Sequence, residues 1–128
     1  MPFAYKINSD NSIVEVDLLG PSDIQDIFNS IEAFTSDTLY RHHFGICWDA
    51  QKSNYLPGYS EVSMIYKEFT KRFHDIIKGR FAIVVGNQIQ YGIGRMASTI
   101  FSSIDIHIEV FFTKEQALLW LKENQLKE

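Results

Sequence analysis

Two almost entirely apolar segments constrain the fold more than any other feature of the sequence. Residues 44–49 read Phe-Gly-Ile-Cys-Trp-Asp, and residues 81–86 read Phe-Ala-Ile-Val-Val-Gly. Apolar side chains on both faces are typical of strands in the middle of a parallel sheet, where both faces are covered. We therefore expect the two segments to pair side by side at the centre of a sheet.

A helical pattern follows each of these segments. The first starts near Val62, and we expect it to continue to Ile77 and to end at Gly79. The second follows Asn87, a residue type that caps helix N-termini. Apolar residues at helical spacing give it an expected buried stripe, which comprises Ile89, Ile93, Met96, Ala97, Ile100 and Ile104.

The N-terminal third predicts a hairpin and a helix. Residues 3–7 and 13–19 are expected to form antiparallel strands near a sheet edge, with a turn at Asp10 and Asn11, which tolerate positive backbone angles. Pro21 is then expected at the first helical position and Asp23 in the first turn.

The C-terminal third predicts one more strand and helix. Ile106, Ile108 and Val110 alternate with polar residues, which favours an edge strand ending at residues 111–112. Residues 113–116 read Thr-Lys-Glu-Gln, a capping box that begins the last helix. The predicted fold class is α/β: a mixed, mostly parallel five-stranded sheet packed with four helices in the order ββαβαβαβα.

The composition is that of an ordinary globular protein. The 128 residues suffice for one domain, expected to span 1–128, with 45% hydrophobic and 22% charged residues. A single cysteine excludes an internal disulfide and fits a reducing cytoplasm. The sequence shows no secretory signal, and no apolar run approaches the roughly 20 residues of a membrane span. We expect a soluble, cytoplasmic protein.

The charge distribution disfavours nucleic acid as a partner. Residues 1–60 carry eight acidic and three basic side chains, whereas binding to a phosphate backbone depends on clustered Lys and Arg. We therefore expect no nucleic-acid binding.

One edge of the predicted sheet is the candidate ligand site. Strand ends at Asp49, Gly86 and Phe112 and helix starts near Tyr59, Gln88 and Lys114 should meet there, where open α/β sheets bind ligands. The alternative for this edge is an empty cap region, since every fold of this class has such an edge, and the alternative for its tyrosines is ordinary surface packing by their rings. The candidate pocket residues are Tyr55, Tyr59, Asn87, Tyr91 and Arg95.

Three segments resemble the SpoIIAA-like branch of the STAS domains, the sulphate-transporter and anti-sigma-factor-antagonist modules. They are the apolar strand ending in Asp49, the stretch 82–96 that includes Gln-Tyr-Gly-Ile-Gly-Arg-Met, and residues 110–121, which end in Ala-Leu-Leu-Trp-Leu. The resemblance covers essentially the whole chain. It implies a non-enzymatic regulatory module that docks a partner protein.

In antagonist members of that family, a phosphorylated Ser beside the helix after the third strand controls docking. In this chain the corresponding run, residues 49–60, reads Asp-Ala-Gln-Lys-Ser-Asn-Tyr-Leu-Pro-Gly-Tyr-Ser, and Asp49 matches by position. The resemblance makes Asp49, Ser53, Ser60 and Lys67 candidates for partner binding or a phospho-switch. A helix-cap serine is the alternative for Ser60. Related members are similar in fold to lipid-transfer domains, so a small apolar ligand is a second candidate.

The sequence favours neither a metal, a cofactor nor a catalytic group. Cys47 lies in a buried strand, where thiols are usually inert, and no two histidines stand at helical i, i+4 spacing. Asp49 is expected to accept N–H bonds from the following loop. An enzyme using Asp49 or His107 is the third hypothesis, after partner docking and the carriage of an apolar or amphipathic ligand.

Two further expectations concern glycines and self-association. Gly92 and Gly94 lie within a helical pattern, where close approach of the helix to the sheet would explain them. The exposed edge of the N-terminal hairpin is a candidate surface for a homodimer.

Overall fold

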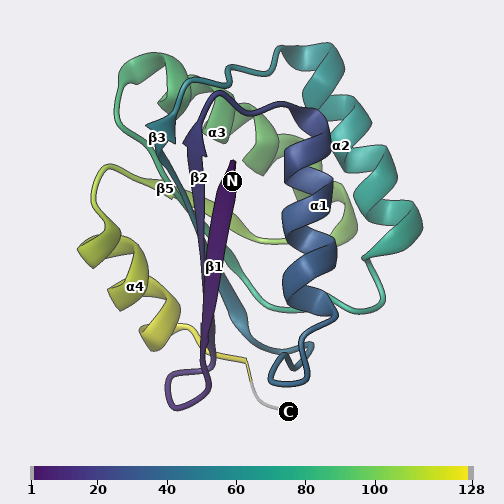
Figure 1. The fold of residues 1–128 in the computed structure, drawn as a ribbon, viewed down its shortest axis with the longest axis vertical. Helices are drawn as coiled ribbons and strands as arrows, with labels where there is room; N and C mark the ends of the chain where they lie inside the picture. The colour runs from purple at the N-terminus through teal and green to yellow at the C-terminus, as the bar shows by residue number, and fades with distance from the viewer. Residues whose placement is uncertain (1, 127–128) are drawn as a thin grey trace.

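The computed structural model describes residues 2–126, which form a five-stranded sheet with four α-helices and one short 3-10 helix (Figure 1). The sheet order is β1-β2-β3-β4-β5; β1 is antiparallel to β2 and the other neighbours are parallel. This confirms the predicted fold class and element order. The elements are β1 (Phe3–Asn8), β2 (Ile13–Gly20), α1 (Ile24–Thr35), β3 (Gly45–Ser53), α2 (Tyr59–Arg72), β4 (Phe81–Val84), α3 (Gln88–Phe101), the 3-10 helix (Ser102–Ile104), β5 (Ile108–Phe111) and α4 (Lys114–Glu123).

The two apolar segments pair as expected at the centre of the sheet. Ile46 lies beside Phe81 and Asp49 beside Val84, in parallel register. Strand β3 is longer than predicted because it continues to Ser53 along β2. The register between these strands shifts, from Asp17 beside Asp49 to Leu19 beside Lys52, so that β3 carries one extra residue. Such a bulge bends the end of a strand.

The N-terminal hairpin and the first helix differ from the prediction at their turns. The positive backbone angle falls on Ser12, with φ 57°, rather than on Asp10 or Asn11. Helix α1 begins at Ile24 rather than at Pro21, because Asp23 is its N-cap. The Asp23 side chain accepts a bond from the Asp26 N–H, and the Asp26 side chain accepts one from the Asp23 N–H.

Helix α2 ends at Arg72, one turn earlier than the predicted end near Ile77. The apolar spacing continues because residues 73–77 form a separate turn, in which the Ile77 N–H donates to the Phe73 carbonyl. Residues 40 and 42 of the same chain then form hydrogen bonds with the backbone that follows the helix. The Tyr40 hydroxyl donates to the Ile76 carbonyl at 2.9 Å, and the Lys78 N–H donates to the His42 carbonyl at 2.8 Å.

The buried face of α3 was predicted only in part. Ala97, Ile100 and Ile104 of the predicted stripe are half-buried against the core, whereas Ile89 is 65% exposed. The fully buried positions of the helix are Gln90, Gly94 and Phe101, which the predicted stripe does not contain. A Cβ on Gly94 would lie 2.9 Å from Cγ2 of Val110. This close approach to β5 fixes the rotation of α3. The contact explains Gly94, as expected. A Cβ added at Gly92 would have no atom within 4 Å, so packing against the sheet does not explain this second glycine.

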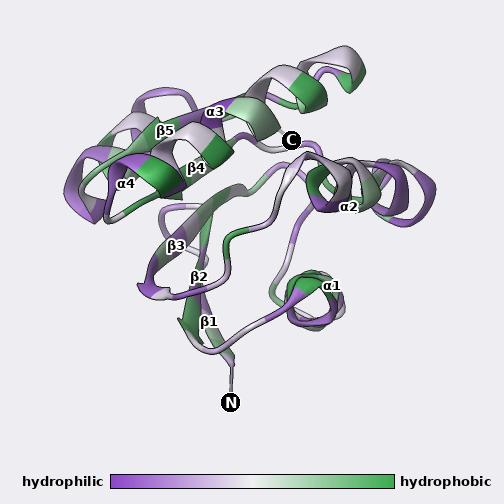
Figure 2. Cartoon of the chain, turned by 90° about the horizontal axis from the view of Figure 1, so that it is seen from above, coloured by the Kyte–Doolittle hydropathy of each residue, from purple (hydrophilic) through white to green (hydrophobic). Residues whose placement is uncertain are grey.

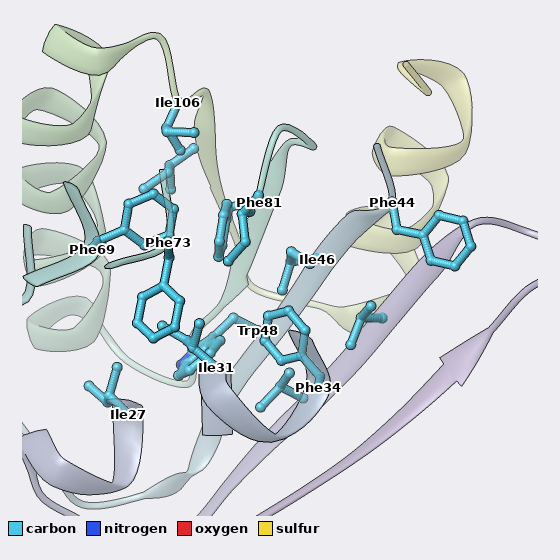
Figure 3. Close-up of a cluster of buried hydrophobic side chains, with 14 of the residues drawn as sticks. Ile27, Ile31, Phe34, Phe44, Ile46, Trp48, Phe69, Phe73, Phe81 and Ile106 are labelled. Atoms are coloured by element: carbon cyan, nitrogen blue, oxygen red, sulfur yellow. The ribbon is translucent and has the colours of Figure 1, made fainter. Parts of the chain in front are cut away.

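The helices cover the two faces of the sheet unequally (Figures 1 and 2). Helix α4 alone lies on one face, whereas α1, α2 and α3 lie on the other. Aromatic and branched side chains fill the space under the three helices, among them Phe69, Phe81 and Trp48 (Figure 3). Helices α3 and α4 pack closely on the strands beneath them, but the backbone of α2 stands farther from the sheet.

The two glycines of α3 provide a test of this packing. We expect Gly92→Ala to raise the free energy of unfolding by up to about 1 kcal/mol, because alanine favours a helix and meets open space there. The same change at Gly94 should lower it, because forcing a methyl group against Val110 costs about 1–3 kcal/mol. Urea unfolding measures both. Equal stabilisation by the two substitutions would contradict the close contact.

Candidate functional site

The strand ends and helix starts meet at one edge of the sheet, as the sequence predicts. Asp49, Val84 and Phe111 lie next to one another in the register of β3, β4 and β5. Helices α2, α3 and α4 begin at Tyr59, Gln88 and Lys114 on the same side. The sheet divides this edge into two regions, an apolar one under α1–α3 and a polar one under α4.

The apolar region contains a cavity of about 150 Å³. Its floor is formed by side chains of β2 to β5, including Trp48 and Ile83. Its walls come from α1, α2 and α3 and from Tyr55 and Pro57 in the loop before α2. The backbone of α2 stands off the sheet, and long side chains bridge the gap: the ring of Phe69 packs edge-on to Phe81 of β4, with centroids 6.0 Å apart. The cavity is the space that these side chains leave open.

The cavity is open to solvent on the side of α2 and α3. Ile83 lies in the middle of β4, a position that is normally buried, yet it is only half-buried. Ile65 on α2 and Ile93 and Ala97 on α3 also line the cavity and are half-buried. The exposed surface of these side chains indicates that the cavity is partly open.

Gln90 is the one amide side chain among the residues that line the cavity, and its hydrogen bonds are all directed to backbone. Its Oε1 accepts from the Gly86 N–H at 2.7 Å, and its Nε2 donates to the carbonyls of Ala50 at 3.0 Å and Ser53 at 3.2 Å. It thereby ties the end of β3 to the start of α3. Because these bonds occupy the amide, Gln90 offers the interior no free polar group.

Tyr55 closes the cavity at its end beside α1 and α2. Its hydroxyl donates to Oε2 of Glu61, in the first turn of α2, at 2.7 Å. Burial raises the pKa of Tyr55, as do the hydrogen bond to Glu61 and the charges of Glu61 and Asp23. The phenol therefore stays protonated and donates the bond.

Asp49 lies on the opposite face of the sheet, in the polar region. Its side chain accepts from the Gln51 N–H at 2.9 Å; the bond was expected from a loop, but Gln51 belongs to the extended end of β3. Lys114 of α4 lies 3.2 Å from Asp17, 3.6 Å from Asp49 and 3.7 Å from Glu15. Burial alone would lower the pKa of Lys114, but the bond to Asp17 and the three carboxylate charges raise it.

Cys47 packs under α4 near the same lysine and is fully buried. Burial raises the pKa of its thiol to about 12, and nearby Lys114 offsets only part of this effect. Since the thiolate is the reactive form, Cys47 is an inert core residue in the folded protein.

The structure separates the four residues suggested for partner binding. Ser53 is buried, its Oγ 2.6 Å from Oγ of Ser22, and it accepts from the Tyr55 N–H at 3.1 Å. Ser60 and Lys67 are exposed on α2, whereas Asp49 lies on the face covered by α4. Of the four, Ser60 and Lys67 share a surface.

The suggested pocket residues are also divided. Tyr55 lines the cavity, and Tyr59 is 69% exposed at the start of α2. Asn87 caps α3 by accepting from the Gln90 N–H at 2.9 Å. Tyr91 stacks on Phe112 with ring centroids 5.2 Å apart, and Arg95 is exposed; neither lines the cavity.

The sequence pattern predicts Tyr55 as a lining residue but not Gln90, Trp48 or the three phenylalanines of the lining, Phe69, Phe81 and Phe101. A signal for Gln90 exists, because Gln90, Gly94, Ala97 and Phe101 share helical spacing and form the face that α3 turns to the sheet. Glycine in that series indicates the close-packed side.

The groups named for catalysis do not form one site. His107 lies at the end of the sheet opposite Asp49, since its carbonyl accepts from the Phe81 N–H at the start of β4. Its ring contacts Glu109 at 2.9 Å and packs edge-on to Trp120. Over the described residues, no three His, Cys, Asp or Glu side chains are grouped to hold a metal ion.

No helix within residues 2–126 has the length and apolar character needed to cross a bilayer.

Comparison with known proteins bears on the fold. No family profile and no curated protein matches the sequence. Among solved structures, the chain is similar to an uncharacterized protein from the DUF3478 family of Shewanella loihica, described as having a SpoIIAA-like fold. The TM-score is 0.62 at 16% sequence identity, over 93% of each chain. The architecture predicted from the sequence is thus shared with this structure, and the chain has a SpoIIAA-like fold.

Proposed function

We propose that the protein binds a small apolar molecule in the cavity between the sheet and helices α1–α3, without catalysing a reaction. The supporting observation is a solvent-reachable cavity of about 150 Å³ with a mostly apolar lining, in which the polar side-chain groups are the Gln90 amide, the Tyr55 hydroxyl and the Trp48 indole N–H. The Gln90 amide and the Tyr55 hydroxyl are already hydrogen-bonded within the protein. A ligand segment with several polar groups would be disfavoured, because most of them would be buried without partners.

The volume limits the size of the buried part of the ligand. An engineered apolar cavity of about 150 Å³ in another protein takes up benzene or xenon. The buried segment should therefore match a single ring or a short branched chain. Aromatic walls such as Trp48, Phe69 and Phe101 favour a ring, through edge-on and offset contacts.

The cavity leaves part of its apolar lining without packing contacts. An enclosed dry void costs about 24 cal/mol per Å³, but water that enters an open cavity offsets part of this cost. A ligand that restores the missing apolar contacts would gain binding affinity from them.

Toluene is a suitable probe, and Ala97→Leu is a suitable blocking variant. Ala97 lines the cavity from α3, so the larger side chain should fill it and weaken toluene binding at least about tenfold, because the ring loses its apolar contacts. A ¹H–¹⁵N NMR titration should show toluene-dependent shifts at Ile83, Val85 and Ala97. The matched control is Ala33→Leu on α1, which does not line the cavity. Unchanged spectra, or unchanged binding by Ala97→Leu, would contradict the proposal.

Partner docking through the loop and α2 is the second candidate function. Its specific support is a group of exposed apolar side chains on this segment: Leu56 is 47%, Tyr59 69% and Met64 53% exposed. Exposed Ser60 and Lys67 lie on the same segment, so phosphorylation of Ser60 would change the charge of this surface. Exposed aromatic and apolar residues of this kind form the centres of protein interfaces.

Charge reversal tests this second candidate. If α2 docks a partner, Lys67→Glu combined with Lys71→Glu should remove proteins that the wild type retains in a pull-down, because two repelled charges at an interface slow association. The control combines Lys6→Glu with Lys122→Glu, both exposed and outside α2. Recovery of the same partners by wild type and the α2 variant would show that this face is not the docking surface.

A further inference from the structure

Trp48 brings a polar group to the apolar cavity. Side chains of β3 alternate between the two faces of the sheet, and those of Ile46 and Trp48 lie under helices α1–α3 (Figure 3). Trp48 is part of the cavity lining, and 8% of its surface is exposed. Its indole ring carries one N–H group, which can donate a hydrogen bond but cannot accept one.

This indole N–H is an unused donor. Within residues 2–126 it donates to no protein acceptor. The nitrogen is not sealed by protein atoms, because it keeps accessible surface in a residue that is otherwise buried. Trp48 lies beside Ile83 in the sheet and both residues line the cavity, so this surface faces the cavity. Buried indole N–H groups usually have a partner, and this one must find its partner in the cavity.

The other polar side chains of the lining already use their protons. The Gln90 amide donates to the carbonyls of Ala50 and Ser53, and the Tyr55 hydroxyl donates to Glu61. Of the described residues that line the cavity, none carries a charge. The lining therefore offers a ligand one free N–H donor and no counter-charge.

A ligand that fills the cavity displaces water from the Trp48 N–H. A purely apolar ligand would leave this donor buried without a partner, which opposes binding. A carbonyl oxygen suits the site because it accepts the bond and brings no proton that itself needs a partner. An ionised group is disfavoured, since burying a charge without a counter-charge costs far more than burying a neutral polar group.

We propose, building on the proposed apolar-ligand function, that the ligand is a neutral carbonyl compound. Its ring-sized or short branched apolar body fills the cavity, and its carbonyl oxygen accepts the hydrogen bond of the Trp48 indole N–H. Elsewhere in the lining the same oxygen would meet apolar side chains, or amide and hydroxyl protons that are already used. Trp48 thereby orients the ligand and selects among uncharged molecules of equal size.

Cyclohexanone and methylenecyclohexane test this inference, because they share one ring and differ at one position, a carbonyl oxygen or a CH₂ group. The chain has two tryptophans, so a ¹H–¹⁵N spectrum shows two indole N–H signals. We expect cyclohexanone to move the Trp48 indole proton downfield, as hydrogen bonding does, and methylenecyclohexane not to do so. Trp120 on α4, on the opposite face of the sheet, should keep its signal with both ligands.

Trp48→Phe removes the donor and keeps an aromatic ring. Both ligands gain the same extra space in this variant, so the ratio of their affinities isolates the hydrogen bond. We expect the affinity of cyclohexanone relative to methylenecyclohexane to fall at least about fivefold. The matched control is Trp120→Phe, which also assigns the two indole signals and should leave the ratio unchanged, because Trp120 does not line the cavity. Should Trp48→Phe disturb folding, the indole signal of the wild type decides by itself.

The outcomes distinguish this inference from the function on which it rests. If both ligands shift the amide signals of Ile83, Val85 and Ala97 but move the Trp48 indole proton alike, the carbonyl assignment is wrong and the apolar site stands. An affinity ratio that Trp48→Phe leaves unchanged has the same meaning. If neither ligand shifts these amides, the apolar-ligand function itself is wrong. A downfield shift with cyclohexanone alone supports both.

Discussion

The parallel pairing of β3 with β4 is the constraint on which the rest of the structure depends. Residues 46–48 and 81–84 are apolar on both faces, so helices must cover both sides of the sheet. Each right-handed crossover then returns the chain to the same end of the sheet. The exits of the central strands and the starts of α2, α3 and α4 therefore share one edge.

The helices on the two faces of the sheet cover the strands differently. On one face α4 packs closely, with Ala117 and Leu121 against Ala82 and Cys47, and Lys114 gathers the acidic groups at its end. On the other face Gly94 draws α3 onto β5, whereas α2 contacts its neighbours chiefly through long side chains and remains away from the strands. The cavity is the space between a close-packed helix and one that stands off.

Much of the fold, and little of the site, could be predicted from the sequence. The order of strands and helices along the chain and the caps at Asn87 and Thr113 follow from local residue patterns, which act over a few positions. The turn that follows α2 depends on hydrogen bonds with Tyr40 and His42, far away in sequence, and the rotation of α3 depends on one contact with Val110. A local sequence pattern does not predict a cavity, because a cavity lies between side chains that come from separate helices and strands.

Contacts around the rim explain why the cavity does not collapse. Lowering α2 onto β4 would fill it, but Arg72 is paired with Glu32 of α1 and the Tyr66 hydroxyl lies 2.9 Å from that of Ser103. Gln90 of α3 holds the ends of β3 and β4 in place through three bonds to backbone. At the start of α2, Glu61 accepts from the Tyr55 hydroxyl at 2.7 Å. Polar contacts at the start, the middle and the last residue of α2 therefore favour its observed distance from the strands, and the open space beneath it follows from the packing of α2 against its neighbours.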